Sequence, residues 1–252
     1  MLPPLEITID ASVAQALALG VVVLDGIGPR QEAAAGASRG RSAEDAIRAA
    51  EAEVRRLLEP DDAATPRVAR AFERARRLYK RFGIDPTKYR PSCEQLARRI
   101  AKGEAFPRVN PIVDAVNLCQ LEERLCYGLY DLDALAPPIV ARVGRAGESY
   151  EGIRKGTHAT PFGSCPERGP RISLEGKPAL FDARGPFGNP TSDSDRAKTG
   201  ERTARALAVV FGAPEIAEAE WREILERTVA TFLLHVSAVV VEKRAVLAGG
   251  GK

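Results

Sequence analysis

Apolar side chains recur at three- and four-residue steps along residues 66–82, the spacing that places them together on one face of a helix. At about 100° per residue they fill one arc of the helix, and arginines fill a second arc on the solvent side. The pattern therefore predicts one helix over Pro66–Phe82, ended by Gly83. The arginines of the solvent arc are Arg67, Arg70, Arg74, Arg77 and Arg81.

Other segments also carry the signals of helices. Ser42 and Asp45 form a capping-box pattern at the start of one helix, and Ser92 is expected to cap another. Asp10 is a candidate cap for a short helix between two strands. These predicted helices are Ala11–Leu19, Ser42–Glu59, Ser92–Lys102 and Ile216–His235.

Between the helices lie short runs that are rich in β-branched residues or alternate between apolar and polar positions. The first two runs, on either side of Ala11–Leu19, form a β-α-β pattern that is typical of an α/β core. After Leu135 the predicted strands follow one another and are separated by Gly and Pro. The strands are expected at Glu6–Asp10, Val21–Leu24, Pro138–Val143, Tyr150–Ile153, Arg171–Leu174, Ala179–Asp182 and Leu207–Phe211.

Composition narrows the classes of protein to which this chain can belong. The 252 residues, 44% hydrophobic and 28% charged, fit one globular domain, taken as residues 1–252. The net charge of +3, from 37 basic and 34 acidic residues, is too balanced to indicate a nucleic-acid partner by itself. DNA is therefore not an expected partner.

Location and redox state also follow from simple features of the chain. Its start lacks the basic and apolar parts of a secretory signal, and the longest near-apolar run, Val229–Val241, is too short and polar to span a bilayer. The four cysteines and two histidines show no metal-ligand or disulfide spacing. We therefore expect a cytoplasmic protein with no membrane partner, no metal and no cofactor.

Residues 106–117 alternate between polar and apolar side chains just before an apolar stretch. Asn110 is expected to cap a helix whose first residue is Pro111, and Asp114 and Asn117 then share one face of it. Together with Arg108, these side chains indicate a loop-to-helix ligand pocket. The alternative is a helix cap with a satisfied polar rim.

A second polar segment, Gly185–Arg196, combines two glycines and two prolines with hydroxyls, carboxylates and a guanidinium. Glycine and proline fix a backbone that can approach a ligand closely, and an amino group or ribose diol needs such polar partners. A solvated turn is the alternative. The polar side chains that we expect to bind substrate here are Thr191, Ser192, Ser194 and Arg196.

Several of these segments together resemble a known family. Arg108–Asn117 and the later Tyr130–Asp133 resemble the B3/B4 domain of the phenylalanyl-tRNA synthetase β chain, and the preceding helix fits as well. The resemblance extends over about Pro91–Ala213 and indicates a free-standing member of the family. Its later part lies in Asp182–Pro186 and Asp195–Thr203.

The resemblance implies an α+β fold with a barrel-like β core and flanking helices. Residues 42–82 are interpreted as a basic helical insert that precedes the matched region. The resemblance also implies an editing site that hydrolyses the ester of wrongly charged tRNA. In the family, a histidine before the Asp-Leu-Asp motif and a later glutamate help to form that site. This chain departs from both, because the histidine position falls on Gly128 and the glutamate position near Ser194 or Asp195.

The two histidines and one of the cysteines are further candidates for a chemical role. His158, in a Gly- and Thr-rich stretch, could position a water or contact a phosphate, or could be an exposed loop residue. His235 lies among apolar residues and is interpreted as a core histidine. Cys165 would act as a nucleophile only with a base beside it, and no local motif supplies one.

The leading hypothesis is an editing-like protein that hydrolyses misacylated aminoacyl-tRNA in trans and binds the aminoacylated acceptor end. Its functional surface would consist of Phe106–Asp133 and Asp182–Thr203, with Asn110, Asp195 and His158 as catalytic residues. The arginine arc would bind the RNA backbone, or would be a solvated helix face. The alternative function is a non-catalytic protein on the same scaffold that binds tRNA or a small ligand.

Overall fold

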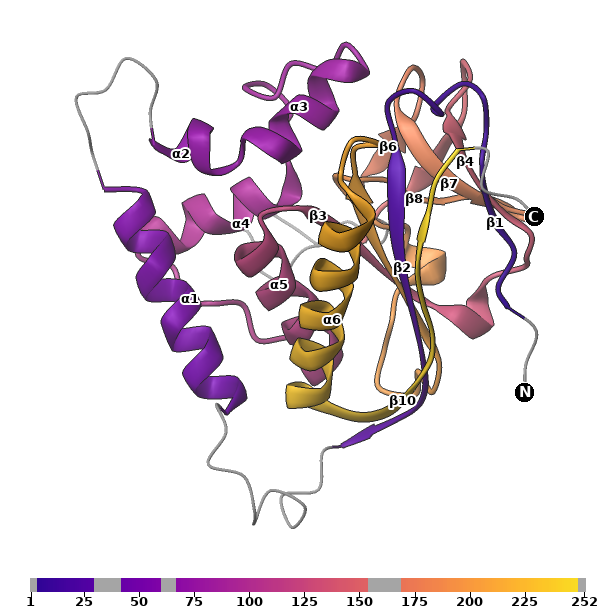
Figure 1. Ribbon diagram of the computed structural model, residues 1–252. Coiled ribbons are helices and arrows are strands. Elements are labelled where there is room, and N and C mark those ends of the chain that lie inside the picture. Colours follow the sequence, from indigo (N-terminus) through magenta and orange to yellow (C-terminus); the bar gives the residue numbers. More distant parts are fainter. Residues whose placement is uncertain (1–3, 30–41, 60–66, 154–168, 249–252) are drawn as a thin grey trace, which may run out of the picture.

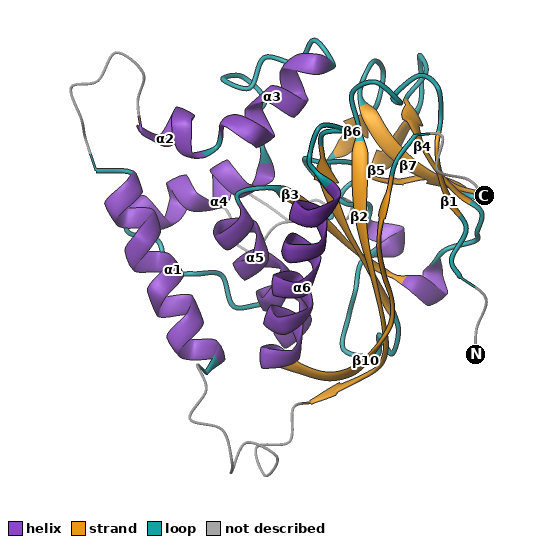
Figure 2. Cartoon of the chain, in the orientation of Figure 1, coloured by secondary structure: helices purple, strands orange, loops and turns teal. Residues whose placement is uncertain are grey.

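The computed structural model describes residues 4–29, 42–59, 67–153 and 169–248, with the side chains of Arg67 and Val68 left out. In this part of the chain, helices lie on one side of the molecule and strands on the other (Figures 1 and 2). The strands form two four-stranded sheets and one two-stranded hairpin.

The central sheet has the strand order β10-β2-β9-β3, and every neighbouring pair is antiparallel. Its strands consist mainly of β-branched and other apolar residues, and β9 is buried along its whole length. Side chains of β9, of β3 and of the first half of β2 are therefore covered on both faces, whereas those of β10 are exposed on one face. The strand bounds are Ala18–Pro29 for β2, Cys126–Asp131 for β3, Ala206–Gly212 for β9 and Val236–Val246 for β10.

The outer sheet has the order β1-β4-β7-β8, in which β1 and β4 are parallel and the other pairs antiparallel. Beside it, β5 and β6 form a separate antiparallel pair. The strand bounds are Ile7–Ile9 for β1, Ile139–Val143 for β4, Ser149–Glu151 for β5, Arg171–Ser173 for β6, Pro178–Asp182 for β7 and Gly185–Gly188 for β8.

Helices α5 and α6 lie side by side and cover one face of the central sheet (Figure 1). Helices α1, α3 and α4 pack with the two sheets in a second, larger apolar cluster. The helices are α1 Ala43–Leu57, α2 Arg67–Ala71, α3 Glu73–Arg81, α4 Ser92–Ala101, α5 Pro111–Glu123 and α6 Glu218–His235. Two 3-10 turns, η2 Leu132–Ala134 and η3 Asp195–Ala197, follow β3 and β8.

Several local predictions are confirmed. Ser42 caps α1 through the expected capping box with Asp45, and Asn110 caps α5 with Pro111 at its first turn. The predicted strands after Leu135 appear as β4, β5, β6, β7 and β9, and the helix predicted at Ile216–His235 is α6. In these segments, the caps and the spacing of apolar residues favour the same element that packing in the folded protein requires.

The helix predicted at Ala11–Leu19 is wrong. Residues 11–16 form turns, in which Asp10 accepts a hydrogen bond from the Ser12 amide at 2.8 Å, and the chain enters β2 at Ala18. A short apolar run does not distinguish a buried strand from a helix, and here both faces of β2 are covered. The β-α-β interpretation fails with it, because β1 and β2 belong to different sheets.

Two helix details also differ from the prediction. The helix expected over Pro66–Phe82 is two helices, because Phe72 leaves the helical conformation (φ −108°, ψ 20°) and buries its ring in the core. Pro66 lies outside the described residues. Pro91, and not Ser92, occupies the cap position of α4, since the Ser92 hydroxyl instead donates to Gln120 Oε1 at 2.7 Å.

The α+β class is confirmed, because the helices and two mostly antiparallel sheets are segregated. The barrel-like core is not confirmed. Within the described residues, the central sheet ends at β10 and β3 and the outer sheet at β1 and β8, so neither closes on itself. The helices of residues 42–82 share the larger apolar cluster with the sheets.

Candidate functional site

The first predicted segment begins as a tightly fixed loop at the start of α5. The Asn110 side chain accepts a hydrogen bond from the Val113 amide at 3.0 Å. Asp114, which is only 7% exposed, accepts one from the Val109 amide at 2.9 Å. Both side chains therefore hold the backbone that leads into the helix.

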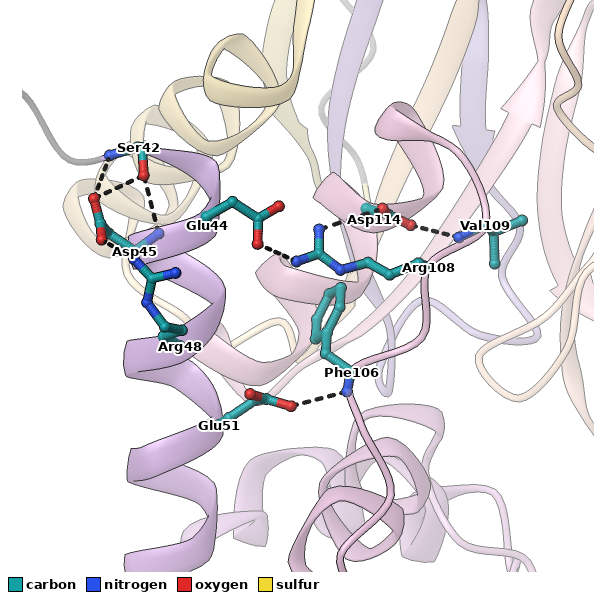
Figure 3. Close-up of polar contacts among 9 residues, drawn as sticks. All are labelled: Ser42, Glu44, Asp45, Arg48, Glu51, Phe106, Arg108, Val109 and Asp114. Carbon is teal, nitrogen blue, oxygen red and sulfur yellow. Dashed lines mark hydrogen bonds and ion pairs between the residues drawn. The ribbon is translucent and has the colours of Figure 1, made fainter.

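Arg108 joins this loop to α1 (Figure 3). Its guanidinium donates to Glu44, lies 3.8 Å from the Asp114 carboxylate and sits 5.6 Å from the centre of the Phe106 ring. The Phe106 amide donates to Glu51 on the same helix at 2.9 Å. Arg108 remains half exposed, so its contacts fix the loop without removing the cation from solvent.

Asn117 lies one turn further along α5. Its side-chain oxygen is 3.5 Å from the Gln120 amide nitrogen, and Gln120 in turn accepts the hydrogen bond from Ser92. Asn117 is partly buried and therefore faces the junction between α4 and α5. Through these contacts, the first segment is joined to α4.

The second predicted segment is organised by a residue that the sequence analysis did not single out. Asn189, 3% exposed, accepts hydrogen bonds from the amides of Thr191 at 2.8 Å and Ser192 at 3.0 Å. The Thr191 hydroxyl lies 2.7 Å from the Tyr79 hydroxyl, and Tyr150 donates to the Ser192 carbonyl at 2.5 Å. The sequence did contain a signal for this turn, because an asparagine side chain commonly accepts a hydrogen bond from the backbone amide two residues further on.

Arg196 is engaged by Asp182. Its two terminal nitrogens lie 2.7 and 3.2 Å from the Asp182 oxygens, which also accept from the amides of Ala136 and Arg184 at 2.9 Å. Burial acts to raise the pKa of Asp182, but the hydrogen bonds from Arg196 and Ala136 outweigh it and hold that pKa below its usual value. The pair ties β7 to the turn that follows β8.

Asp195 and Ser194 are adjacent in sequence but lie in different surroundings. Asp195 is at the surface, with its carboxylate 2.7 Å from the Lys198 ammonium. Ser194 is 1% exposed, and its hydroxyl has no hydrogen-bond partner among the described residues. Its amide donates to the Phe187 carbonyl at 2.9 Å, which places Ser194 against β8.

Tyr130 occupies the region to which the family histidine maps. Its hydroxyl lies between two glycines, because a Cβ built on Gly128 would be 2.0 Å from that oxygen and one built on Gly188 would be 2.1 Å. The hydroxyl is fully buried, lies close to the Asp193 carboxylate and has no other hydrogen-bond partner in the described structure. Burial raises the pKa of Tyr130 well above its ordinary value, so the group stays protonated.

The two predicted segments meet at β3, where the Leu129 amide donates to Asp193 at 3.3 Å and the Thr203 hydroxyl donates to Asp131 at 2.8 Å. The bonds of Arg108, Asn110 and Asp114 instead stay in the loop or run to α1, and within the described ranges none of them reaches residues 191–196. A shared pocket therefore stays a prediction. His158 and Cys165 lie outside the described residues. His235 is buried as expected, with Nδ1 2.9 Å from the Thr231 carbonyl oxygen.

The predicted RNA-binding arginines are largely paired with glutamates. Arg74 pairs with Glu220, Arg77 lies 3.6 Å from Glu73, and Arg81 donates to Glu215 at 2.8 Å. Two of these pairs anchor α3 beside the start of α6. Arg70 is exposed, and the side chain of Arg67 is not described.

A buried ion pair on α3 was missed by the sequence analysis. Arg76 makes two hydrogen bonds of 2.7 Å to Glu94, and Arg98 adds one of 2.8 Å. Glu94 is completely buried, which no periodicity of charges reveals. Burial acts to raise the pKa of Glu94, but Arg76 and Arg98 lower it overall.

The described residues contain neither a candidate metal site nor a candidate membrane span. The His, Cys, Asp and Glu side chains of this part of the chain form no group of three that could hold a metal ion. No helix in the same part has the length and apolar character needed to cross a bilayer.

Comparison with known proteins places the chain in a family. No curated protein sequence matches it. An N-terminal fragment of the phenylalanyl-tRNA synthetase β-subunit from Pyrococcus horikoshii is a structural neighbour, at 10% identity and a TM-score of 0.42. The alignment covers 97% of this chain and 51% of that one, so the chain spans about half the length of the fragment. The B3/4 domain family matches residues 74–209, and the chain belongs to that family.

Proposed function

We propose that this protein hydrolyses the aminoacyl ester of misacylated tRNA and acts in trans. Family membership and the resemblance of both polar segments to a tRNA-editing domain support the proposal. The observation that carries it is the pair of buried hydroxyls on Tyr130 and Ser194, which both lie against β8. Ser194 has no hydrogen-bond partner among the described residues, and Tyr130 has none there beyond the Asp193 carboxylate. Buried polar groups of this kind are normally satisfied, so a water or ligand group is the expected partner.

The proposed chemistry is attack by water on the ester carbonyl. The water oxygen forms a bond to the carbonyl carbon, the ester C–O bond breaks, and the ribose oxygen that leaves takes up a proton. The Tyr130 hydroxyl, kept protonated by burial, and the Ser194 hydroxyl would donate to the carbonyl oxygen as negative charge develops there. A hydroxyl of the tRNA ribose would help to activate the water.

The remaining predicted residues keep their roles in this proposal. Asn110 and Asp195 would act at the ester, while Arg108, Asp114 and Asn117 would bind the aminoacyl group together with the turn after β8. His158 would position the water. Asp114 and Arg196 would in addition hold their own loops, through the Val109 amide and Asp182.

The acceptor arm of tRNA would lie along α3. Exposed ion pairs such as Arg77–Glu73 contribute only about 0–1 kcal/mol each, so a phosphate can replace the glutamate at little cost. The arginine arc would thus bind phosphates by charge and would not read the nucleotide sequence.

One experiment tests the proposal directly. Purified protein is incubated with a panel of mischarged tRNAs, and loss of the aminoacyl group is followed over time. Cleavage should exceed the spontaneous rate for at least one tRNA, survive chelators and thiol-blocking reagents, and fall in Ser194→Ala and Tyr130→Phe. The exposed Ser237→Ala and Tyr89→Phe variants provide matched controls. Cleavage by none of the panel would remove the hydrolase proposal.

A non-catalytic binding protein is the second candidate, and one observation favours it. The Tyr130 hydroxyl fills the space that a side chain at position 128 would need, so the histidine of the family has no room here. In this case the protein should bind aminoacylated tRNA more tightly than uncharged tRNA without releasing the amino acid. Filter binding with both forms, alongside the deacylation assay, separates the two functions.

A further inference from the structure

A cavity of about 270 Å³ lies at the edge of the central sheet, where Leu132 and Asp133 end the first predicted segment. Its apolar wall includes Leu5, Val23, Leu132 and Leu135. Its charged lining is Asp25, Asp133, Glu242 and Arg205. Gly128, Tyr130 and Ser194 do not line it. The cavity is therefore a separate feature from the proposed ester site.

The fold brings these residues together through the register of three strands. Leu24 on β2 lies opposite Ala206 on β9, so the next residues in this antiparallel ladder, Asp25 and Arg205, come beside each other. The Leu132 amide donates to the Arg205 carbonyl at 3.0 Å, which brings η2 to the same edge. The Leu5 amide donates to Glu242 on β10 at 2.9 Å and closes the far side.

Asp25 and Arg205 retain hydrogen-bonding capacity. One Asp25 oxygen accepts from the Gly26 amide at 2.7 Å, and the other has no partner among the described residues. Arg205 uses Nε, 3.0 Å from Asp133, and Nη2 on the same carboxylate, which leaves Nη1 without a partner in that part of the chain. Asp133 first, and then Asp25 and Asp131, raise the pKa of Arg205.

We propose that this cavity binds a free α-amino acid with an apolar side chain. The ammonium group would bind the Asp25 carboxylate, the carboxylate would bind Arg205, and the side chain would pack on Val23 and Leu135. Asp133 is already bound by Arg205, and Glu242 by the Leu5 amide and Arg244. The open oxygen of Asp25 and the open Nη1 of Arg205 then match a zwitterion with an apolar body. The volume is below that of pockets for drug-sized ligands, roughly 300–1,000 Å³, and suits a single amino acid.

Calorimetric titration with chemically related ligands tests the two polar contacts. L-leucine and L-phenylalanine should give saturable heats. Leucinamide lacks the carboxylate and isocaproate lacks the ammonium, so each should bind at least about tenfold more weakly than leucine. Leucinamide also resembles the esterified amino acid of a charged tRNA. Equal affinity for leucine and leucinamide would overturn the Arg205 contact and the assignment to a free amino acid.

Two variants with matched controls locate the ligand. Val241 lines the cavity and is 41% exposed, so Val241→Trp should block the cavity, whereas Val239→Trp, on the same strand but outside the lining, should not. Asp25→Asn should weaken leucine binding at least about tenfold, while the surface variant Asp85→Asn should leave it unchanged. Leucine binding that is unaltered in Val241→Trp, or absent from the wild-type protein, would overturn the proposal. Deacylation measured on the same variants distinguishes this result from failure of the proposed hydrolase.

Discussion

The hydroxyl of Tyr130 lies where a side chain on Gly128 would have to begin, 2.0 Å from the position of its Cβ. The two residues are on the same face of β3, two positions apart, and the ring also packs edge-on against Phe187 at 4.8 Å between centroids. Glycine at 128 and tyrosine at 130 therefore depend on each other.

Gly128→Ala should destabilise the protein by about 1–3 kcal/mol, because the added methyl group overpacks the core against the Tyr130 ring. Urea denaturation measures the loss. In a Tyr130→Leu background the same substitution should cost less than about 1 kcal/mol, since the obstructing ring is gone. Gly200→Ala, where a Cβ meets nothing within 4 Å, is the control. Equal costs at 128 with and without Tyr130 would contradict this packing argument.

The features that were predicted correctly are those that depend on residues close together in the sequence. The caps Ser42 and Asn110 and the amphipathic α6 depend on residues a few positions apart, and the structure contains them as predicted. Ala11–Leu19 failed because its continuous apolar run is equally suited to a helix and to a strand covered on both faces. Only the neighbours β9 and β10 decide between them, and they lie roughly two hundred residues further along the chain.

The candidate site shows the same division. Sequence identified the polar segments, but it could not show that Arg196 is held by Asp182 or that Tyr130 fills the space at Gly128. It also missed Arg76, because alternating charges on a helix do not reveal which arginine turns inward to a buried Glu94. Each of these contacts joins residues from different elements.

Glu94→Ala should cost about 3–5 kcal/mol, because it leaves the guanidinium of Arg76 buried without its partner. Glu104→Ala on the neighbouring loop removes an exposed partner of Arg99 and should cost less than about 1 kcal/mol. Chemical denaturation of the two variants compares them under identical conditions. Similar, small losses in both would show that the Arg76–Glu94 pair contributes no more than a surface pair.

Arg196→Met should destabilise the protein most at neutral pH. The folded-state pKa of Asp182 is lowered in the wild type, so its contribution is present above the unfolded pKa of about 3.9 and is lost as pH falls. Without Arg196, only the amides of Ala136 and Arg184 oppose burial, so the folded-state pKa of Asp182 should rise and less of this contribution should remain. The loss, about 2 kcal/mol near pH 7 because Arg196 is 32% exposed, should shrink toward about pH 3.5.

Unfolding at several pH values measures this difference. Lys198→Met removes the exposed partner of Asp195 and is the control, with little expected change at any pH. A loss in Arg196→Met that stays constant across the whole pH range would mean that Asp182 does not titrate as argued.

Asn110→Ala should lower stability by about 1 kcal/mol whether or not Asn110 takes part in catalysis, because it removes the cap of α5. Asn110→Asp keeps an oxygen for the Val113 amide and should restore stability. Thermal unfolding tests this expectation. If Asn110 also acts at the ester, deacylation should stay low in Asn110→Asp despite the restored fold, and wild-type activity in that variant would leave Asn110 only its capping role.

Replacing Arg70, Arg74 and Arg77 together with alanine should weaken tRNA binding and flatten its dependence on salt. Each phosphate contact that is lost lowers the slope of log affinity against log salt by about one. Because Arg74 and Arg77 already pair with Glu220 and Glu73, the change should be smaller than three free cations would give. Titration of labelled tRNA at several salt concentrations measures both quantities.

The matched control for this experiment is the triple substitution of Arg48, Arg55 and Arg56 on α1. These arginines are also exposed and also pair with acidic residues on their own helix, so the variant removes the same charge from a different surface. Equal losses in the two triple variants would indicate attraction by net charge alone. A loss of tRNA affinity that occurs only in the Arg70, Arg74 and Arg77 variant would place the RNA against α2 and α3, because only there would the removed charge lie next to phosphate.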